Sequence, residues 1–139
     1  MTVRQAIAKA EMILPGRPAP EGENDPRWQA IIAIGEFIEN EPDAVWTFVK
    51  RWGRYRSKDL QAAVATVLLE HLLQHHFEKL FNLVENETTK SKDFAYMFSI
   101  CSKFRQSCKR KNAVRFDKLK EECKRKQGVR TWRGQLTRQ

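Results

Sequence analysis

The 139-residue chain is long enough for one domain with a hydrophobic core, and 41% of its residues are hydrophobic. Its formal net charge is +9. Its three cysteines are an odd number at no metal-ligand spacing, which predicts free thiols in a reducing, cytoplasmic compartment. Charged residues interrupt the first apolar stretch, so we expect neither a signal peptide nor a membrane-spanning segment.

The positive charge is concentrated at the C-terminal end of the chain. Residues 1–102 contain 12 Lys and Arg against 14 Asp and Glu, a balance of −2. Residues 103–139 contain 14 Lys and Arg against 3 Asp and Glu, a balance of +11. This asymmetry indicates an anionic partner for one end of the molecule.

The N-terminal part predicts a helix, a loop and a second helix. Residues 2–13 have apolar side chains roughly on one helical face. The stretch 15–26 follows, and its four prolines and two glycines are incompatible with regular structure. Asp25 and Pro26 then have the residue types of an N-cap and a first helical position, so we expect the second helix to run from there to about Glu39.

A third helix is expected from Asp43 to Trp52, with Gly53 placed to end it. Gly35 lies inside the predicted second helix, where glycine costs about 1 kcal/mol relative to alanine. Either the close approach of a neighbouring helix or simple tolerance of a weak position accounts for it.

The most hydrophobic stretch of the chain is residues 60–73. Apolar side chains at helical spacing cover most of its circumference, no Gly or Pro interrupts it, and Ser57 is positioned to cap it. Such a helix requires neighbours on several sides, so we expect it to be the central helix of the fold, with Leu68 in the core. The stretch is too short to cross a bilayer.

The C-terminal half predicts three more helices. The hydrophobic pattern shifts at His75–His76, and a fifth helix follows and ends in the polar run 85–89. Ser91 is positioned to cap a sixth helix. The apolar stripe of this helix is Phe94, Met97, Phe98, Cys101 and Phe104.

A seventh helix is expected from an Asn112 cap to Gln127, with Gly128 ending it. Its apolar stripe is thin and consists of Phe116, Leu119 and Cys123.

The predicted fold is therefore all-α, with about seven helices in antiparallel pairs that form a bundle or a short α-solenoid. Within this single domain we expect an N-terminal helix at 1–14, a Pro/Gly-rich loop at 15–26, a helical core at 27–108, and a basic C-terminal helix and tail at 109–139.

The segment 57–68, which reads Ser-Lys-Asp-Leu-Gln-Ala-Ala-Val-Ala-Thr-Val-Leu, resembles the second helix of a HEAT-type repeat, and the helix before it resembles the partner helix. The resemblance is best over residues 43–73. It implies stacked helix pairs with a concave binding face. HEAT-like proteins include peptide-binding scaffolds and DNA glycosylases, but no residue here matches a glycosylase site.

Sequence motifs for catalysis are missing. The chain contains no nucleophile elbow, phosphate loop or dinucleotide fingerprint, so we expect no cofactor and have no basis for an enzymatic activity. His71 and His75 lie four residues apart, a spacing that zinc sites use, but no third ligand is evident, and ordinary histidines at a helix end are the alternative. Cys108 lies among cations that lower a thiol pKa, so it is either a reactive thiol or an ordinary cysteine.

The strongest functional pattern is the basic segment from Lys103 to Arg138. Cations at this density can neutralise several phosphates and release counterions, and Trp132 could stack on a base. We therefore predict binding of DNA or RNA with little sequence preference. The alternatives are a protein-interaction module whose basic tail meets an acidic partner, and a small HEAT-like enzyme acting on DNA. The candidate nucleic-acid-binding residues are Lys109, Arg110, Lys111, Arg115, Lys118, Lys124, Arg125, Lys126, Arg130, Trp132 and Arg133, with a second basic cluster at Arg51, Arg54 and Arg56.

Overall fold

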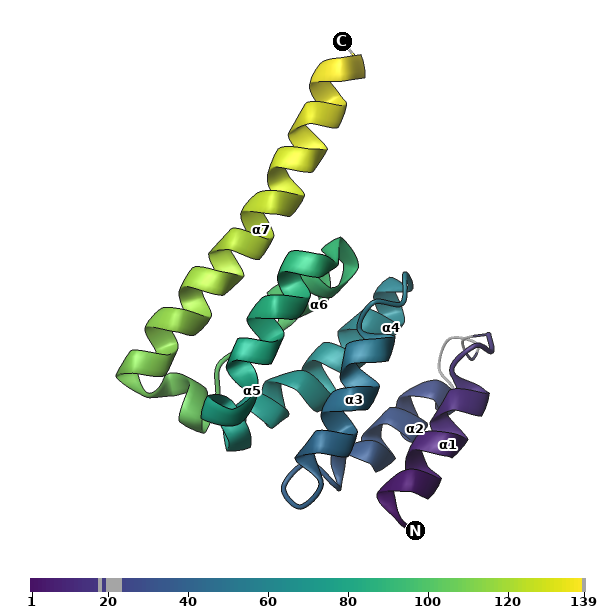
Figure 1. Ribbon diagram of the computed structural model, residues 1–139. Helices are drawn as coiled ribbons and strands as arrows, with labels where there is room; N and C mark the ends of the chain where they lie inside the picture. The colour runs from purple at the N-terminus through teal and green to yellow at the C-terminus, as the bar shows by residue number, and fades with distance from the viewer. Residues whose placement is uncertain (18, 20–23, 139) are drawn as a thin grey trace.

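A computed structural model describes residues 1–17, 19 and 24–138, and the side chains of these residues as far as Gln127. Throughout this part of the chain the regular structure is helical, which confirms the all-α prediction. The helices pack around one core, and α7 lies beside α6 and extends beyond the rest of the helical body (Figure 1). The elements are α1 (Val3–Ile13), α2 (Pro26–Gly35), α3 (Pro42–Trp52), α4 (Lys58–Ala63), the π-helical segment η1 (Val64–Leu69), α5 (Glu70–Lys90), α6 (Lys92–Ile100), the 3₁₀ turn η2 (Arg105–Cys108) and α7 (Arg110–Arg138).

Three helices start where their capping residues predicted. Asp25 Oδ1 accepts a hydrogen bond of 2.9 Å from the backbone N–H of Arg27, with Pro26 as the first residue of α2. Ser57 caps α4 and Ser91 caps α6, and each hydroxyl oxygen accepts the backbone N–H three residues further on. The caps satisfy N–H groups that no helical carbonyl can reach, so these predicted starts are confirmed.

The segments α4, η1 and α5 follow one another without a break and form the centre of the fold. The predicted central helix, 60–73, lies within them, and Leu68 is fully buried. Residues 64–69 adopt the wider π conformation in place of the expected α-helix. The predicted shift at His75–His76 corresponds to a kink inside α5, because His76 has φ −138° and ψ 43°.

The fifth predicted helix was expected to end in the polar run 85–89. This end is wrong, because α5 continues to Lys90. The polar side chains are satisfied inside the fold. Thr88 is buried, and its hydroxyl donates to the carbonyl three residues earlier. Glu87 is buried as well, and Arg54 forms an ion pair with it.

The second helix also ends earlier than predicted. α2 stops at Gly35, and residues 36–40 form a turn, so Gly35 is at the end of the helix and not inside it. A Cβ atom on Gly35 would lie 3.7 Å from Leu68 Cδ2, which is ordinary van der Waals contact. The neighbouring helix therefore leaves room for a methyl group here.

Gly53, which ends α3 as predicted, has no such room. A Cβ atom there would lie 2.6 Å from Met97 Cε and 2.7 Å from the carbonyl oxygen of Val49. The residue has φ −63°, so close packing and not a left-handed backbone requires glycine at this position.

We expect Gly53→Ala to lower the free energy of unfolding by about 1–3 kcal/mol, the usual cost of overpacking a core. Gly35→Ala is the matched control and should change it by less than about 0.5 kcal/mol. Urea denaturation of both variants measures the difference, and equal effects would contradict the packing argument.

The sixth helix is shorter than its predicted apolar stripe. α6 ends at Ile100, and Phe104 lies in the following loop, where it is 40% exposed and stacks on His71 with ring centroids 5.6 Å apart. The other members of the stripe are buried as expected, namely Phe94, Met97, Phe98 and Cys101.

Both predicted ends of the seventh helix are wrong. α7 begins at Arg110, and Asn112 is a buried residue inside it whose Nδ2 donates a 2.9 Å hydrogen bond to the carbonyl oxygen of Gln106. Gly128 does not end the helix, which continues to Arg138. One glycine weakens a helix by about 1 kcal/mol relative to alanine but need not terminate it.

Both ends of the chain contribute to the core. Ala10 of α1 is fully buried, and the three apolar residues predicted for α7, which include Phe116, are buried as well. The Phe116 ring lies 5.1 Å from the ring of Phe98, centroid to centroid. The segments 1–14 and 109–127 therefore belong to the same packed body as the predicted core.

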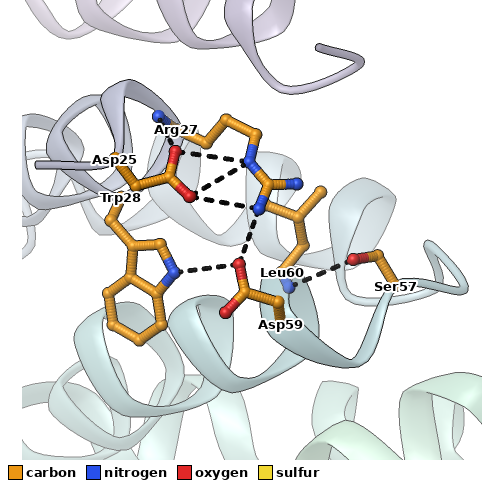
Figure 2. Close-up of polar contacts among 6 residues, drawn as sticks. All are labelled: Asp25, Arg27, Trp28, Ser57, Asp59 and Leu60. Carbon is orange, nitrogen blue, oxygen red and sulfur yellow. Dashed lines mark hydrogen bonds and ion pairs between the residues drawn. The ribbon is translucent and has the colours of Figure 1, made fainter. Parts of the chain in front are cut away.

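A buried arginine links α2 to α4 (Figure 2). Arg27 is 5% exposed, and its guanidinium lies between the carboxylates of Asp25 and Asp59, at 3.1 and 2.6 Å. Trp28 Nε1 donates to Asp59 at 3.2 Å. Burial opposes ionisation of Asp25, but the hydrogen bonds and charge of Arg27 outweigh it and lower the pKa of this carboxyl. The paired charges offset the cost of burying Arg27.

Candidate nucleic-acid interface

A hollow of about 420 Å³ opens between the start of α4, the helix α6 and the middle of α7. We call it the basic hollow. It is lined by Arg56, Lys58, Gln61, Lys92, Asp93, Tyr96, Ser99, Lys124 and Gln127.

Positive charge dominates the lining of the basic hollow. Its four cations come from three separate parts of the chain, and Asp93 is the one carboxylate among its lining residues. Arg56 Nε lies 3.6 Å from Asp93 Oδ2, and the Arg56 side chain is 85% exposed, so this ion pair is screened by water. The remaining charge of the lining suits an anionic ligand.

Two glutamine side chains hold the walls of the basic hollow together. Gln61 Nε2 donates to the carbonyl oxygen of Asp93 at 2.9 Å, which joins α4 to α6. Gln127 Nε2 donates to the carbonyl oxygen of Lys92 at 3.2 Å, which joins α7 to α6. The cations therefore project from walls whose backbones are fixed to one another.

The basic hollow also contains an aromatic ring. Tyr96 of α6 is half-buried in its wall, and the Lys58 ammonium lies 5.8 Å from the ring centroid. An ammonium at this distance is attracted by the face of the ring.

Most residues of the basic hollow were not predicted from the sequence, although a signal for them exists. The triplet Ser-Lys-Asp occurs twice, at 57–59 and 91–93, and each copy opens a helix. Lys58 and Lys92 both line the basic hollow as residues next to an N-cap. The sequence alone does not show that these two helix starts are neighbours, so the repeated triplet does not by itself indicate a shared site.

The outward face of α7 carries a second set of cations. Lys111, Lys118 and Arg125 are exposed and follow one another at intervals of seven residues, so they share one face of the helix. The other exposed candidates in this region are Lys109, Arg110, Lys124 and Lys126.

Among the described candidates on α7, Arg115 has its side chain engaged with α5. Its Nη2 lies 2.9 Å from Glu85 Oε1 and donates to Asn82 at 2.7 Å. Its guanidinium lies 4.9 Å from the centroid of the Phe81 ring. These contacts hold α7 against α5.

The second basic cluster is divided between two places. Arg56 lines the basic hollow, whereas Arg51 and Arg54 line a different groove of about 340 Å³ between α1 and α3. Arg51 forms an ion pair of 3.2 Å with Glu11 of α1, and Arg54 pairs with Glu87. Only Arg56 of these three therefore adjoins the cations of α7 in the basic hollow.

The predicted contacts of Arg130, Trp132 and Arg133 lie outside the described side chains. The structure assigns these residues to the helix α7, which continues past the basic hollow.

The candidate metal ligands have protein partners. His71 Nδ1 lies 2.8 Å from Gln74 Oε1, and His75 Nδ1 lies 3.5 Å from Glu39 Oε1. Among the described residues, no group of three or more His, Cys, Asp or Glu side chains could hold a metal ion.

Two of the three cysteines are buried. Burial, and after it the charge of Glu70, raises the pKa of Cys101 well above the ordinary value. Burial also raises the pKa of Cys123 to about 11. Cys108 is the exposed thiol.

Comparison with known protein families, characterised proteins and solved structures gave no match to this chain. Within the described residues, no helix has both the length and the apolar composition needed to cross a membrane.

Proposed function

We propose that the protein binds nucleic acid with little sequence preference and without catalysing a reaction on it. Lysine and arginine side chains in the basic hollow and on the outward face of α7 would contact the phosphates. Phosphate contacts position a protein on nucleic acid but carry no sequence information, so a surface of this kind favours general binding.

The observation that carries this proposal is that cations from residues 1–102 and a cation from the C-terminal segment 103–139 line the same basic hollow. Residues 1–102 have a slightly negative balance, yet Arg56, Lys58 and Lys92 from that part lie around the same hollow as Lys124 of α7. A basic tail that served only solubility would not need cations of the body beside it. The pairing of Arg115 with Glu85 supports the same proposal, because it fixes the basic helix on the body.

The test is a salt titration of binding to a labelled oligonucleotide, followed by fluorescence anisotropy. If about four to six phosphates are contacted, log K should fall against log salt with a slope of about −3 to −5. Replacing Lys124, Arg125 and Lys126 together with alanine should weaken binding to every sequence and flatten the slope by about 2.

The matched control removes three exposed cations at the other end of the molecule. Arg4, Lys9 and Arg17 are exposed in or just after α1, and replacing them with alanine gives the same change in net charge. This variant should retain most of the affinity. Absence of binding at ~50 mM salt, where phosphate contacts are strong, would refute the proposal and favour an acidic protein partner. Equal losses in the two triple variants would show that binding follows net charge and that the cations of α7 are not the binding surface.

A further inference from the structure

We infer that the basic hollow binds one stretch of single-stranded nucleic acid, with phosphates between its lysines and a base stacked on Tyr96. This inference rests on the proposed function and names the class of nucleic acid. It depends on the shape, the aromatic ring and the arrangement of charges in the hollow.

The size of the basic hollow favours a single strand over a duplex. Its volume of about 420 Å³ is within the range of about 300–1,000 Å³ in which proteins enclose small ligands. A duplex keeps its bases stacked in the interior, so none can enter a concave site without being flipped out. An unpaired nucleotide has no such restriction.

The aromatic ring supplies the contact that distinguishes a base from a phosphate. Tyr96 is half-buried, and the ring belongs to a helix whose start is fixed by the Gln61 and Gln127 hydrogen bonds. Proteins that bind single strands combine a basic groove with rings on which bases stack. The Lys58 ammonium lies over this ring, 5.8 Å from its centroid, so a base that stacks on the same face displaces the ammonium, which then contacts the adjacent phosphate.

The positive charges of the lining come from more than one helix. Lys92 is at the start of α6 and Lys124 is on α7, so a strand in the hollow passes between cations of two helices. Asp93 is part of the same lining and pairs with Arg56. Its carboxylate therefore repels a phosphate near Arg56, unless the phosphate takes the place of Asp93 in that ion pair. A strand in the hollow is therefore guided towards Lys92 and Lys124.

The test compares a single-stranded oligonucleotide of about 12 thymidines with a hairpin duplex of the same total charge, at one salt concentration. Tyr96→Leu should weaken single-strand binding by about tenfold and change duplex binding by less than about twofold. Tyr96→Phe keeps the ring and should bind like the wild type. Tyr55→Leu, at an exposed tyrosine that does not line the hollow, is the control for loss of an aromatic residue.

A second pair of variants tests the charge arrangement independently of the ring. Lys124 and Lys126 are both exposed on α7, but only Lys124 lines the basic hollow. Lys124→Gln should weaken single-strand binding more than Lys126→Gln does, whereas the two should weaken duplex binding equally. Thermal melting followed by circular dichroism shows whether each variant remains folded.

The possible failures are distinguishable. If Tyr96→Leu weakens single-strand and duplex binding equally, or Lys124→Gln and Lys126→Gln behave alike towards the single strand, the inference is wrong and the proposed function remains. If the wild-type protein binds neither oligonucleotide, both are wrong.

Discussion

Replacing Leu68 with alanine is expected to lower the free energy of unfolding by about 2–5 kcal/mol, the range for truncating a buried leucine. Leu68 is fully buried within η1, and it lies between α2 and the rest of the core, because its Cδ2 faces the position of Gly35. The cavity left by the missing atoms cannot close easily, since helices pack on η1 from several sides.

Urea denaturation measures this effect, and Leu83→Ala is the control. Leu83 is in α5 and is 41% exposed, so its truncation should cost less than about 1 kcal/mol. An unchanged denaturation midpoint for Leu68→Ala would mean that the centre of the core has been assigned to the wrong residues.

The second large effect is expected at Gln106, whose side-chain amide bridges the kink in α5. The backbone N–H of Phe77 donates to Gln106 Oε1 at 3.0 Å, and Gln106 Nε2 donates to the carbonyl oxygen of His75 at 2.7 Å. The kink at His76 interrupts the helical hydrogen bonds, and one glutamine replaces a donor and an acceptor at the break.

Gln106→Ala should destabilise the protein by about 1–3 kcal/mol for each of the two backbone groups that lose their partner. Gln106→Glu should be intermediate, because a carboxylate can accept from Phe77 but cannot donate to His75. Gln29→Ala, at an exposed glutamine of α2, is the control and should have almost no effect. Denaturation by urea ranks the three variants, and a Gln106→Ala variant as stable as Gln29→Ala would show that water replaces the bridge.

Local chemistry was sufficient to predict much of the fold. The cap residues Asp25, Ser57 and Ser91 act within three residues of themselves, so the sequence around them determines where α2, α4 and α6 begin. The hydrophobic face of residues 60–73 was likewise predictable, because burial over a whole helix circumference needs a run of apolar residues.

Features that depend on distant parts of the chain were not predictable in this way. The pattern at Asn112 resembles an N-cap, but its amide reaches back to Gln106 from inside α7. The polar run 85–89 resembles a helix end, but Glu87 is satisfied by Arg54 on another segment. In both cases a tertiary partner changes the role that a polar residue has in isolation.

The candidate site could be predicted only in part, because some of its residues are brought together by contacts between distant segments. Lys124 belongs to a dense basic run, and charge counting is enough to find it. Lys58 and Lys92 are 34 positions apart in the sequence, and only the packing of α4 against α6 brings them to one hollow. Tyr96 had no signal of its own, because half-buried aromatic residues are common on core helices.

The π-helical segment has a consequence for the length of the chain. A turn closed between residues i and i+5 holds one more residue than a turn closed between i and i+4. Consider a protein in which the helices before and after 64–69 bury the same faces, but an α-helix replaces the π-helical segment. Its chain would be one residue shorter. In an evolutionary comparison, a single-residue gap in this buried stretch would mark a change from π to α geometry and not a loss of the fold.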